Sequence, residues 1–215
     1  MEDQRDHWER VYRDSPERFG NEPSQIGREA LRIFQDRGDR RILELGCGQG
    51  RDTLLFLRNG LEVVGIDYSE TGLCHLRERI DSLDLKGYLH LLVHDMRKNL
   101  PLPDRSVDSC FSHMFFTMQL REEELRLIFQ ECLRTLKPGG LNIYSVRNVH
   151  DPHCGQGTWR GEDMWENNGF VVHFFSEEKV RDLAEGYRIE SISRFQEGAL
   201  PKELFQVVLA KPDQM

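Results

Sequence analysis

The chain has 215 residues, which is the length of one domain, and its 29 basic and 37 acidic side chains give a formal net charge of −8 at pH 7. The acidic balance argues against a general binder of nucleic-acid phosphates, and the sequence contains no apolar run of about 18 residues that could cross a membrane. The charged N-terminal sequence is unlike a secretory signal, and the five cysteines form no CxxC pair, so we expect a cytoplasmic protein with reduced thiols.

Short apolar runs alternate with helical patterns between residues 41 and 147. The apolar runs predict strands at 41–45, 61–67, 88–95, 106–113 and 141–147. The helical patterns lie between them, at 52–59, 70–83 and 121–137. Because strands that alternate with helices form βαβ units, this order predicts a mostly parallel sheet with helices on both faces.

Other parts of the chain depart from this alternation. A helix at 177–186 precedes two successive strands, at 187–195 and 204–211, which can form an antiparallel pair at one edge of the sheet. Residues 1–35 predict a helical N-terminal arm. Residues 148–175 form a long, aromatic and glycine-rich segment, which we interpret as a lid insertion over the active site rather than as disorder.

The most informative stretch follows the first predicted strand. From Glu44 to Gly50 it reads Glu-Leu-Gly-Cys-Gly-Gln-Gly, and its glycines let backbone N–H groups approach a ligand closely. Asp67 ends the second strand, where a carboxylate can accept hydrogen bonds from both hydroxyls of a ribose. A dinucleotide-binding loop would place a third glycine at Arg51, and a buried Glu44 would repel a pyrophosphate. The pattern therefore favours a ligand that carries an ammonium group over NAD.

These motifs resemble those of class I S-adenosylmethionine-dependent methyltransferases of the small bacterial and archaeal type. The glycine-rich stretch and the run VVGIDYS resemble the first two motifs of the family, and Asp95-Met96 resembles its adenine-binding acid and the following residue. A fourth strand at 107–113 and the turn at 136–140 follow in the family's order. The resemblance covers about residues 40–147. It implies an α/β fold with a doubly wound, seven-stranded, mostly parallel Rossmann-like sheet whose last strand is antiparallel.

The resemblance also implies a cofactor, S-adenosyl-L-methionine, with S-adenosyl-L-homocysteine as its product. Glu44 and the backbone of Gly46, Cys47 and Gly48 would hold the methionine end of the cofactor. Asp67 would bind the ribose diol.

Five further residues complete the implied site. Tyr68 would pack near the adenine, Asp95 would bond the adenine amino group, and Met96 would lie on its ring. Ser112 and His113 would line the site below the sulfonium, at the end of the fourth strand.

The residues at the end of the fourth predicted strand limit the class of methyl acceptor. Enzymes of this class that methylate exocyclic amines carry an (N/D)PP(Y/F) tetrad there, whereas this chain has Ser-His-Met-Phe at 112–115. It also lacks the Pro-Cys nucleophile of a cytosine C5 enzyme. Together with the acidic charge, these features favour a free small molecule over nucleic acid or protein as acceptor. We expect no membrane partner, and a monomer or homodimer.

Several side chains have two interpretations. His113 is a candidate general base or a part of the pocket wall, and no other catalytic residue is assigned. Trp8 and Tyr12, one helical turn apart, either close over the cofactor or fasten the arm to the core. Arg147 and Arg160 either clamp an acidic substrate or are solvated at the surface.

No metal is expected. His150, His153, Cys154 and His173 carry zinc-binding groups, but their spacing matches no standard pattern. We therefore predict a single methyltransferase domain over 1–215 that transfers a methyl group from S-adenosylmethionine to a small molecule. Two alternatives stay open: a module that binds the cofactor without transfer, and an NAD-linked oxidoreductase on a similar fold.

Overall fold

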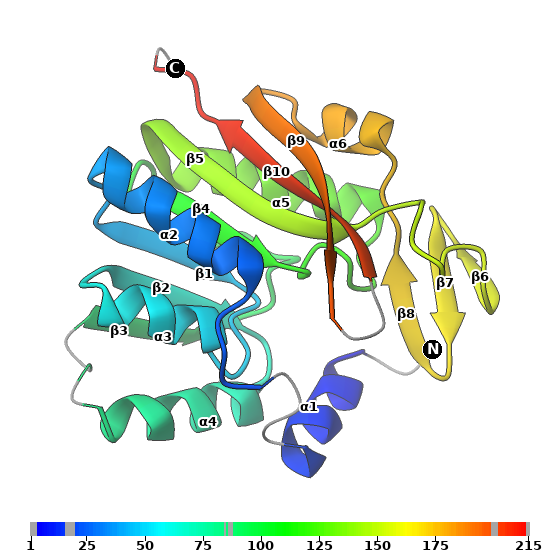
Figure 1. Cartoon of the computed structure of the whole chain (residues 1–215), viewed down its shortest axis with the longest axis horizontal. Coiled ribbons are helices and arrows are strands. Elements are labelled where there is room, and N and C mark those ends of the chain that lie inside the picture. Colours follow the sequence, from blue (N-terminus) through cyan, green and yellow to red (C-terminus); the bar gives the residue numbers. More distant parts are fainter. Residues whose placement is uncertain (1–3, 16–19, 84, 86–87, 199–201, 214–215) are drawn as a thin grey trace.

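A seven-stranded sheet forms the centre of the molecule, with the strand order β3-β2-β1-β4-β5-β10-β9 (Figure 1). The computed structural model describes residues 4–15, 20–83, 85, 88–198 and 202–213. The strands of this sheet are β1 (Arg41–Leu45), β2 (Glu62–Asp67), β3 (Leu89–Val93), β4 (Val107–His113), β5 (Leu136–Arg147), β9 (Arg188–Glu197) and β10 (Lys202–Ala210).

The strand directions agree with the predicted fold. β1 pairs in parallel with β2 and with β4, and parallel pairing continues to β3 on one side and to β5 on the other. β10 runs antiparallel to both of its neighbours, β5 and β9. The prediction of a doubly wound, mostly parallel sheet whose last strand is antiparallel is therefore confirmed.

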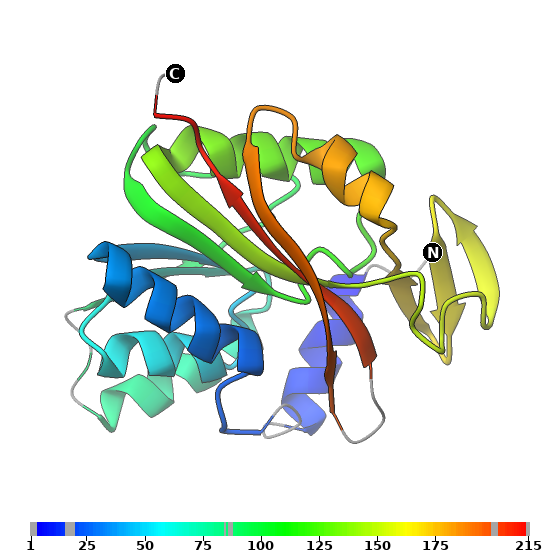
Figure 2. The ribbon, with the colours of Figure 1, turned by 45° about the horizontal axis from the view of Figure 1, so that its top comes forward.

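Helices cover both faces of this sheet (Figures 1 and 2). The described helices are α1 (Gln4–Asp14), α2 (Gln25–Arg37), α3 (Arg51–Arg58), α4 (Glu70–Asp81), α5 (Glu122–Thr135) and α6 (Glu177–Leu183). Side chains alternate along a strand, so Ile42 belongs to the core cluster that contains residues of α2, α3 and α4, while the next residue, Leu43, belongs to the cluster that contains residues of α5 and α6. Both faces of β1 are thus buried, as expected for a central parallel strand.

The junction between α5 and β5 differs from the prediction. The helix ends at Thr135 rather than at Lys137, and Leu136 already has extended backbone angles (φ −65°, ψ 138°). Lys137 precedes Pro138, whose ring disfavours helical geometry at the residue before it. β5 consequently begins at Leu136 and passes through an irregularity before it pairs regularly with β4.

The segment 148–175 folds into a second, three-stranded antiparallel sheet: β6 (Thr158–Gly161), β7 (Met164–Asn167) and β8 (Phe170–His173). Two-residue turns join the strands, and their residues Glu162-Asp163 and Asn168-Gly169 all have positive φ. This backbone matches the twist of a hairpin, and Asn-Gly is its strongest sequence signal. The irregular lid predicted from composition is therefore an ordered sheet, which stands beside the main sheet in Figure 1.

A buried ion pair holds the start of this segment. Arg147, the last residue of β5, donates from Nε to Asp151 at 2.9 Å and from its Nη2 to the other carboxylate oxygen, and its guanidinium lies over the ring of Phe174. Arg147 is therefore neither a substrate clamp nor a solvated surface residue. Arg160 pairs with Glu166 on the neighbouring strand.

Within the described ranges, none of the helices has both the length and the apolar character needed to span a bilayer.

Candidate active site

A cavity of about 630 Å³ opens at the carboxyl ends of the central parallel strands. The chain winds from β1 to β2 and β3 on one side of the sheet, and then crosses to β4 and β5 on the other side. Such a reversal leaves a crevice at the strand ends, where open α/β sheets bind their ligands. The cavity walls come from the β1–α3 loop, the ends of β2, β3 and β4, helix α1 and the strands β9 and β10.

The glycine-rich loop between β1 and α3 forms the floor of this cavity. Gly46 and Gly48 have φ values of 68° and 49°, which are costly for any residue with a Cβ atom. A Cβ atom at Gly46 would lie 2.9 Å from the ring of Phe115, and one at Gly48 would collide with the hydroxyl of Tyr12. Glycine therefore sets both the path of this loop and its close contact with the opposite wall.

Glu44 lies beneath the loop, at the cavity end of β1. Its side chain is buried, and Oε2 accepts a hydrogen bond of 2.6 Å from the hydroxyl of Thr53. Burial raises the pKa of the Glu44 carboxyl well above its usual range, and the nearby Asp52 adds to this effect. A cationic group in the cavity would stabilise the ionised form of Glu44.

Asp67 ends β2 on the other side of the loop. One carboxylate oxygen accepts a hydrogen bond from the N–H of Gly48 and the other from the N–H of Ser69, both at 2.9 Å. Burial raises the pKa of Asp67 to about 6, although these backbone donors act in the opposite direction. The carboxylate is thus held rigidly at the cavity wall, with lone pairs left for further donors.

The structure places the other predicted cofactor residues around the same cavity, with one exception. Tyr68, Asp95, Met96 and Cys47 all line it. Asp95 accepts hydrogen bonds from the guanidinium of Arg97, at 2.9 Å from both Nε and Nη2.

The exception is Ser112. It is fully buried and is not among the residues that line the cavity. Side chains alternate along β4, so Ser112 points to the same face as Cys110, which belongs to the core beneath α5. His113, the next residue, reaches the cavity instead.

His113 is held on both sides of its ring. Nδ1 lies 2.8 Å from the hydroxyl of Ser145, and Nε2 lies 2.9 Å from a carboxylate oxygen of Glu197. Burial by itself would raise the pKa of Glu197, but the interaction with His113 and the charge of Arg51 outweigh it and hold the pKa at about 2. Nδ1 is thus hydrogen-bonded, and Nε2 lies within ion-pair distance of Glu197 without a hydrogen bond of standard geometry, so this arrangement favours the pocket-wall interpretation of His113 over a free general base.

Helix α1 closes the cavity from above and is itself supported by the small sheet. Tyr12 is buried against the glycine loop, and Trp8 packs on the ring of Tyr12 with centroids 5.7 Å apart. Trp8 also meets Phe170 of β8 edge-on, at 5.3 Å. The two residues thus line the cavity and also fasten the arm, and their closure over a cofactor stays a prediction.

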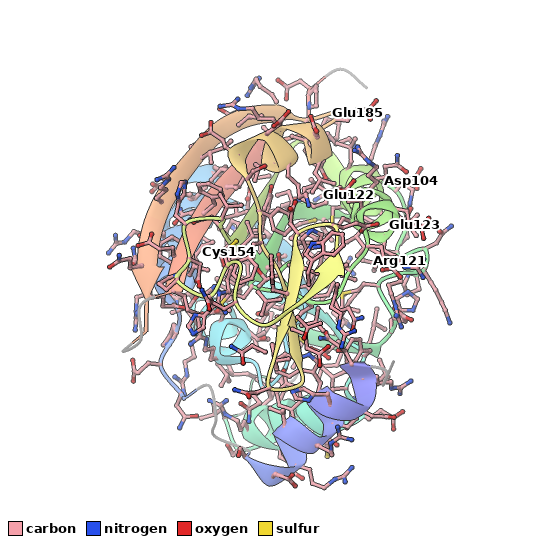
Figure 3. The ribbon with its side chains drawn as sticks, turned by 90° about the vertical axis from the view of Figure 1, so that its right-hand side faces the viewer. Asp104, Arg121, Glu122, Glu123, Cys154 and Glu185 are labelled. Atoms are coloured by element: carbon pink, nitrogen blue, oxygen red, sulfur yellow. The ribbon has the colours of Figure 1, made fainter. Side chains whose placement is uncertain are left out.

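The described residues of 148–175 do not line the cavity themselves. They contact α1, which stands between them and the site; Gln4, for example, donates to the carbonyl of Val171 at 3.3 Å. Figure 3 looks onto this small sheet, with Cys154 on one side of it and Glu122 at the start of α5 on the other. In the part of the chain that the structure describes, no group of three or more His, Cys, Asp or Glu side chains is arranged to hold a metal ion.

Among the cavity residues that sequence reasoning missed are two charged side chains at the far end of the main sheet. Glu197 and Lys202 lie at the adjoining ends of β9 and β10, where they are directly opposite each other. Nothing local in the sequence marks them, because their place beside His113 depends on how the final hairpin is laid against β5.

Comparisons with known proteins agree with this geometry. A family model described as a methyltransferase domain matches residues 42–140. A probable S-adenosylmethionine-dependent methyltransferase of Mycolicibacterium smegmatis is 33% identical over 109 residues, which are 51% of this chain and 38% of that protein. The malonyl-[acyl-carrier protein] O-methyltransferase of Methylococcus capsulatus is 32% identical over 150 residues, which are 68% of this chain and 51% of that protein. The chain thus matches about half or less of the length of these curated relatives.

The fold has close counterparts among solved structures. The 1,6-didemethyltoxoflavin-N1-methyltransferase of Burkholderia thailandensis, solved with bound 1,6-didemethyltoxoflavin and S-adenosylhomocysteine, superposes with a TM-score of 0.76 at 17% identity. The superposition covers 97% of this chain and 87% of that one. The chain belongs to the class I S-adenosylmethionine-dependent methyltransferases. Family membership favours methyl transfer over the hydride transfer considered from the sequence.

The cavity residues fit the cofactor of this family. Its ammonium, ribose diol and adenine amino group are donors, and Glu44, Asp67 and Asp95 supply three carboxylates around one space. Gln49 also lines the cavity, and both polar atoms of its amide are buried without a hydrogen-bond partner in the protein.

Proposed function

We propose that this chain binds S-adenosylmethionine in the cavity and transfers its methyl group to a small-molecule acceptor, with S-adenosylhomocysteine as the product. The observation that carries the proposal is the buried carboxylate of Asp67, held by the N–H groups of Gly48 and Ser69 on the wall of one cavity with Glu44. The cofactor supplies a methyl group bound to a positively charged sulfur. The protein's contribution is to bring the acceptor into line with that group.

Each cavity residue has a proposed role in holding the cofactor. Glu44 and the loop Gly46–Cys47–Gly48 hold the methionine end, where the carboxylate of Glu44 faces the ammonium group. Asp67 accepts from the ribose hydroxyls, and Tyr68 packs beside the adenine.

In this proposal Asp95 and Met96 bind the adenine end of the cofactor. Asp95 accepts from the adenine amino group, in exchange for part of its present pairing with Arg97, and Met96 packs on the ring. Ser112 has no proposed contact with the cofactor, because its side chain faces the core.

The acceptor would enter between α1 and the ends of β9 and β10. A small molecule is supported by the cover that α1 places over the cavity and by the acidic charge of the chain. In this proposal α1, within the predicted arm 1–35, is the immediate cover, and the sheet formed by 148–175 braces α1 from outside through Phe170, whereas α2 belongs to the core of the main sheet. The arm has to move, at least in part, when ligands exchange.

Calorimetric titration with S-adenosylmethionine and S-adenosylhomocysteine tests the cofactor site. We expect micromolar binding by the native chain, and binding weakened at least about tenfold by Asp67→Ala, which removes a charge-assisted pair of hydrogen bonds. Asp36→Ala, at an exposed position on α2, is the matched control and should bind like the native chain. Absence of binding to both ligands would contradict the proposal.

Turnover is a separate measurement. Release of S-adenosylhomocysteine in the presence of candidate small-molecule acceptors would support methyl transfer. Cofactor binding without turnover across a broad acceptor set would instead support the module that binds without transfer.

A further inference from the structure

One end of the cavity is not accounted for by the family motifs. It lies where β9 and β10 meet, and it is lined by Glu197, Gly198 and Lys202 together with Arg51 and His113. The residues that connect the two strands, 199–201, lie outside the described ranges. The charges at this end decide what kind of acceptor can bind there.

The carboxylate of Glu197 already has partners. One oxygen lies 2.9 Å from Nε2 of His113 and 3.8 Å from Nη2 of Arg51. Glu197 is therefore an anion whose charge is compensated within the protein. It offers little attraction to a cationic acceptor.

Lys202 has no such partner. It stands directly opposite Glu197 in the antiparallel pair, where opposite charges usually interact across the strands. Glu197 instead turns towards His113, and among the described residues no carboxylate lies within ion-pair distance of the Lys202 ammonium.

Its surroundings make this lack of a partner costly. Lys202 is half-buried, and burial lowers the pKa of its ammonium although the nearby charge of Glu197 acts in the opposite direction. Burial of an unpaired ammonium group costs free energy unless a bound anion compensates its charge.

We propose that Lys202 binds an anionic group of the methyl acceptor, and that the acceptor is a small molecule with one carboxylate and an apolar body. The inference rests on the proposed function for its biological meaning. One unpaired ammonium matches one unit of negative charge, which suits a carboxylate better than a dianionic phosphate. The cavity wall also includes Trp8, Phe115 and Met118, which provide apolar contacts for the rest of the molecule.

Two probes of equal shape and different charge test this proposal. Benzoate and benzamide are titrated calorimetrically into the native chain, both free and saturated with S-adenosylhomocysteine. We expect benzoate to bind the native chain at least fivefold more tightly than benzamide does. Lys202→Met should weaken benzoate binding about tenfold and leave benzamide unchanged, whereas Lys202→Arg should keep benzoate within about threefold of native.

Lys137→Met is the matched control. It removes the same charge from a lysine at the opposite end of the sheet, where Lys137 pairs with Asp108, and it should not change benzoate binding. Near-ultraviolet circular dichroism of each variant establishes that it is folded.

Three results would overturn the proposal: no benzoate binding by the native chain, equal binding of benzoate and benzamide, or equal binding of benzoate by the native chain and Lys202→Met. Failure of S-adenosylhomocysteine to bind would contradict the proposed function instead. The titrations of the free chain would still decide the role of Lys202 in that case.

Discussion

The ionised carboxylate of Asp67 has two roles, one in the fold and one in the proposed cofactor site. It fixes the glycine loop through Gly48 and the start of α4 through Ser69, and it is the proposed acceptor for the ribose hydroxyls. Burial raises the pKa of Asp67 from its ordinary value of 3.8 to about 6. Ligand binding and folding therefore respond to pH through the same side chain, and they do so with opposite signs.

We predict that the affinity for S-adenosylhomocysteine falls as the pH drops through about 6, because the protonated carboxyl is a poorer acceptor. Calorimetry should show binding roughly tenfold weaker at pH 5 than at pH 7. Asp67→Asn should bind weakly at both values and show a smaller pH dependence, which leaves only the contribution of Glu44, whose pKa burial also raises. In the free chain the raised pKa acts the other way: the stability that Asp67 contributes is present in full below 3.8 and is lost as the pH rises through about 6. An affinity that is constant from pH 5 to pH 7 would contradict the role of Asp67.

A substitution of Gly48 tests whether the loop needs glycine for its close contact with Tyr12 or only for its positive φ. Gly60 has a similar positive φ of 78°, but a methyl group added there would have no atom within 4 Å, whereas a methyl group at Gly48 would meet Tyr12. Each substitution to alanine should cost about 1–2 kcal/mol of stability from backbone strain. Calorimetry should show at least a tenfold loss of S-adenosylhomocysteine affinity for Gly48→Ala and none for Gly60→Ala. Equal affinities of Gly48→Ala and Gly60→Ala would mean that cofactor binding does not depend on the close contact between the loop and Tyr12.

At the scale of elements, the N-terminal helix depends on a sheet far from it in the sequence. α1 packs on α4 and covers the cavity, while β8 supports it from the outer side through the contacts of Phe170 with His7 and Trp8. An eleven-residue helix is marginal by itself in water, so this support contributes to the order of the cover.

We predict that Phe170→Ala loosens α1 without disturbing the main sheet. Loss of its aromatic contacts should speed amide hydrogen exchange in residues 4–14 by roughly threefold to tenfold. Hydrogen exchange followed by mass spectrometry measures this, with Trp159→Ala on β6 as the control because Trp159 is 63% exposed. Unchanged exchange in α1, or equal changes in both variants, would show that the small sheet does not brace the arm.

At the scale of the whole molecule, the cavity joins parts of the chain that lie far apart in sequence. The glycine loop, α1, the end of β4 and the final hairpin all line this one cavity. A ligand that bridges them binds the native state and not the unfolded chain, so it should stabilise the whole domain.

Thermal unfolding measures that stabilisation. At a concentration one hundred times its Kd, S-adenosylhomocysteine should add about 2.7 kcal/mol and raise the Tm by about 5–10 °C for a chain of this length. Asp67→Ala at the same ligand concentration should show a clearly smaller rise. A Tm that does not respond to the ligand would argue against binding in the cavity.

Much of the fold was predictable because its signals are local. Strand runs such as 41–45 and the helix that begins after the glycine loop follow from periodicity, and β1 (Arg41–Leu45) has the predicted bounds. Glu44 and Asp67 were predictable as neighbours because each ends a strand of the same parallel sheet, and parallel strands end at the same edge. The Asn-Gly signal of the hairpin at 168–169 was also local, although composition alone favoured an irregular lid.

Other features of the cavity were decided by tertiary structure, because they depend on which segments, distant in the sequence, lie side by side in the fold. Two features have no local signal: the face of β4 to which Ser112 points, and the cover that α1 forms over the cavity. The acceptor end is the clearest case. The antiparallel hairpin of β9 and β10 carries Glu197 to His113 at the end of β4, and among the described residues Lys202 is left without a carboxylate partner. Periodicity reports which side of an element is apolar, but charge compensation is a property of three-dimensional proximity.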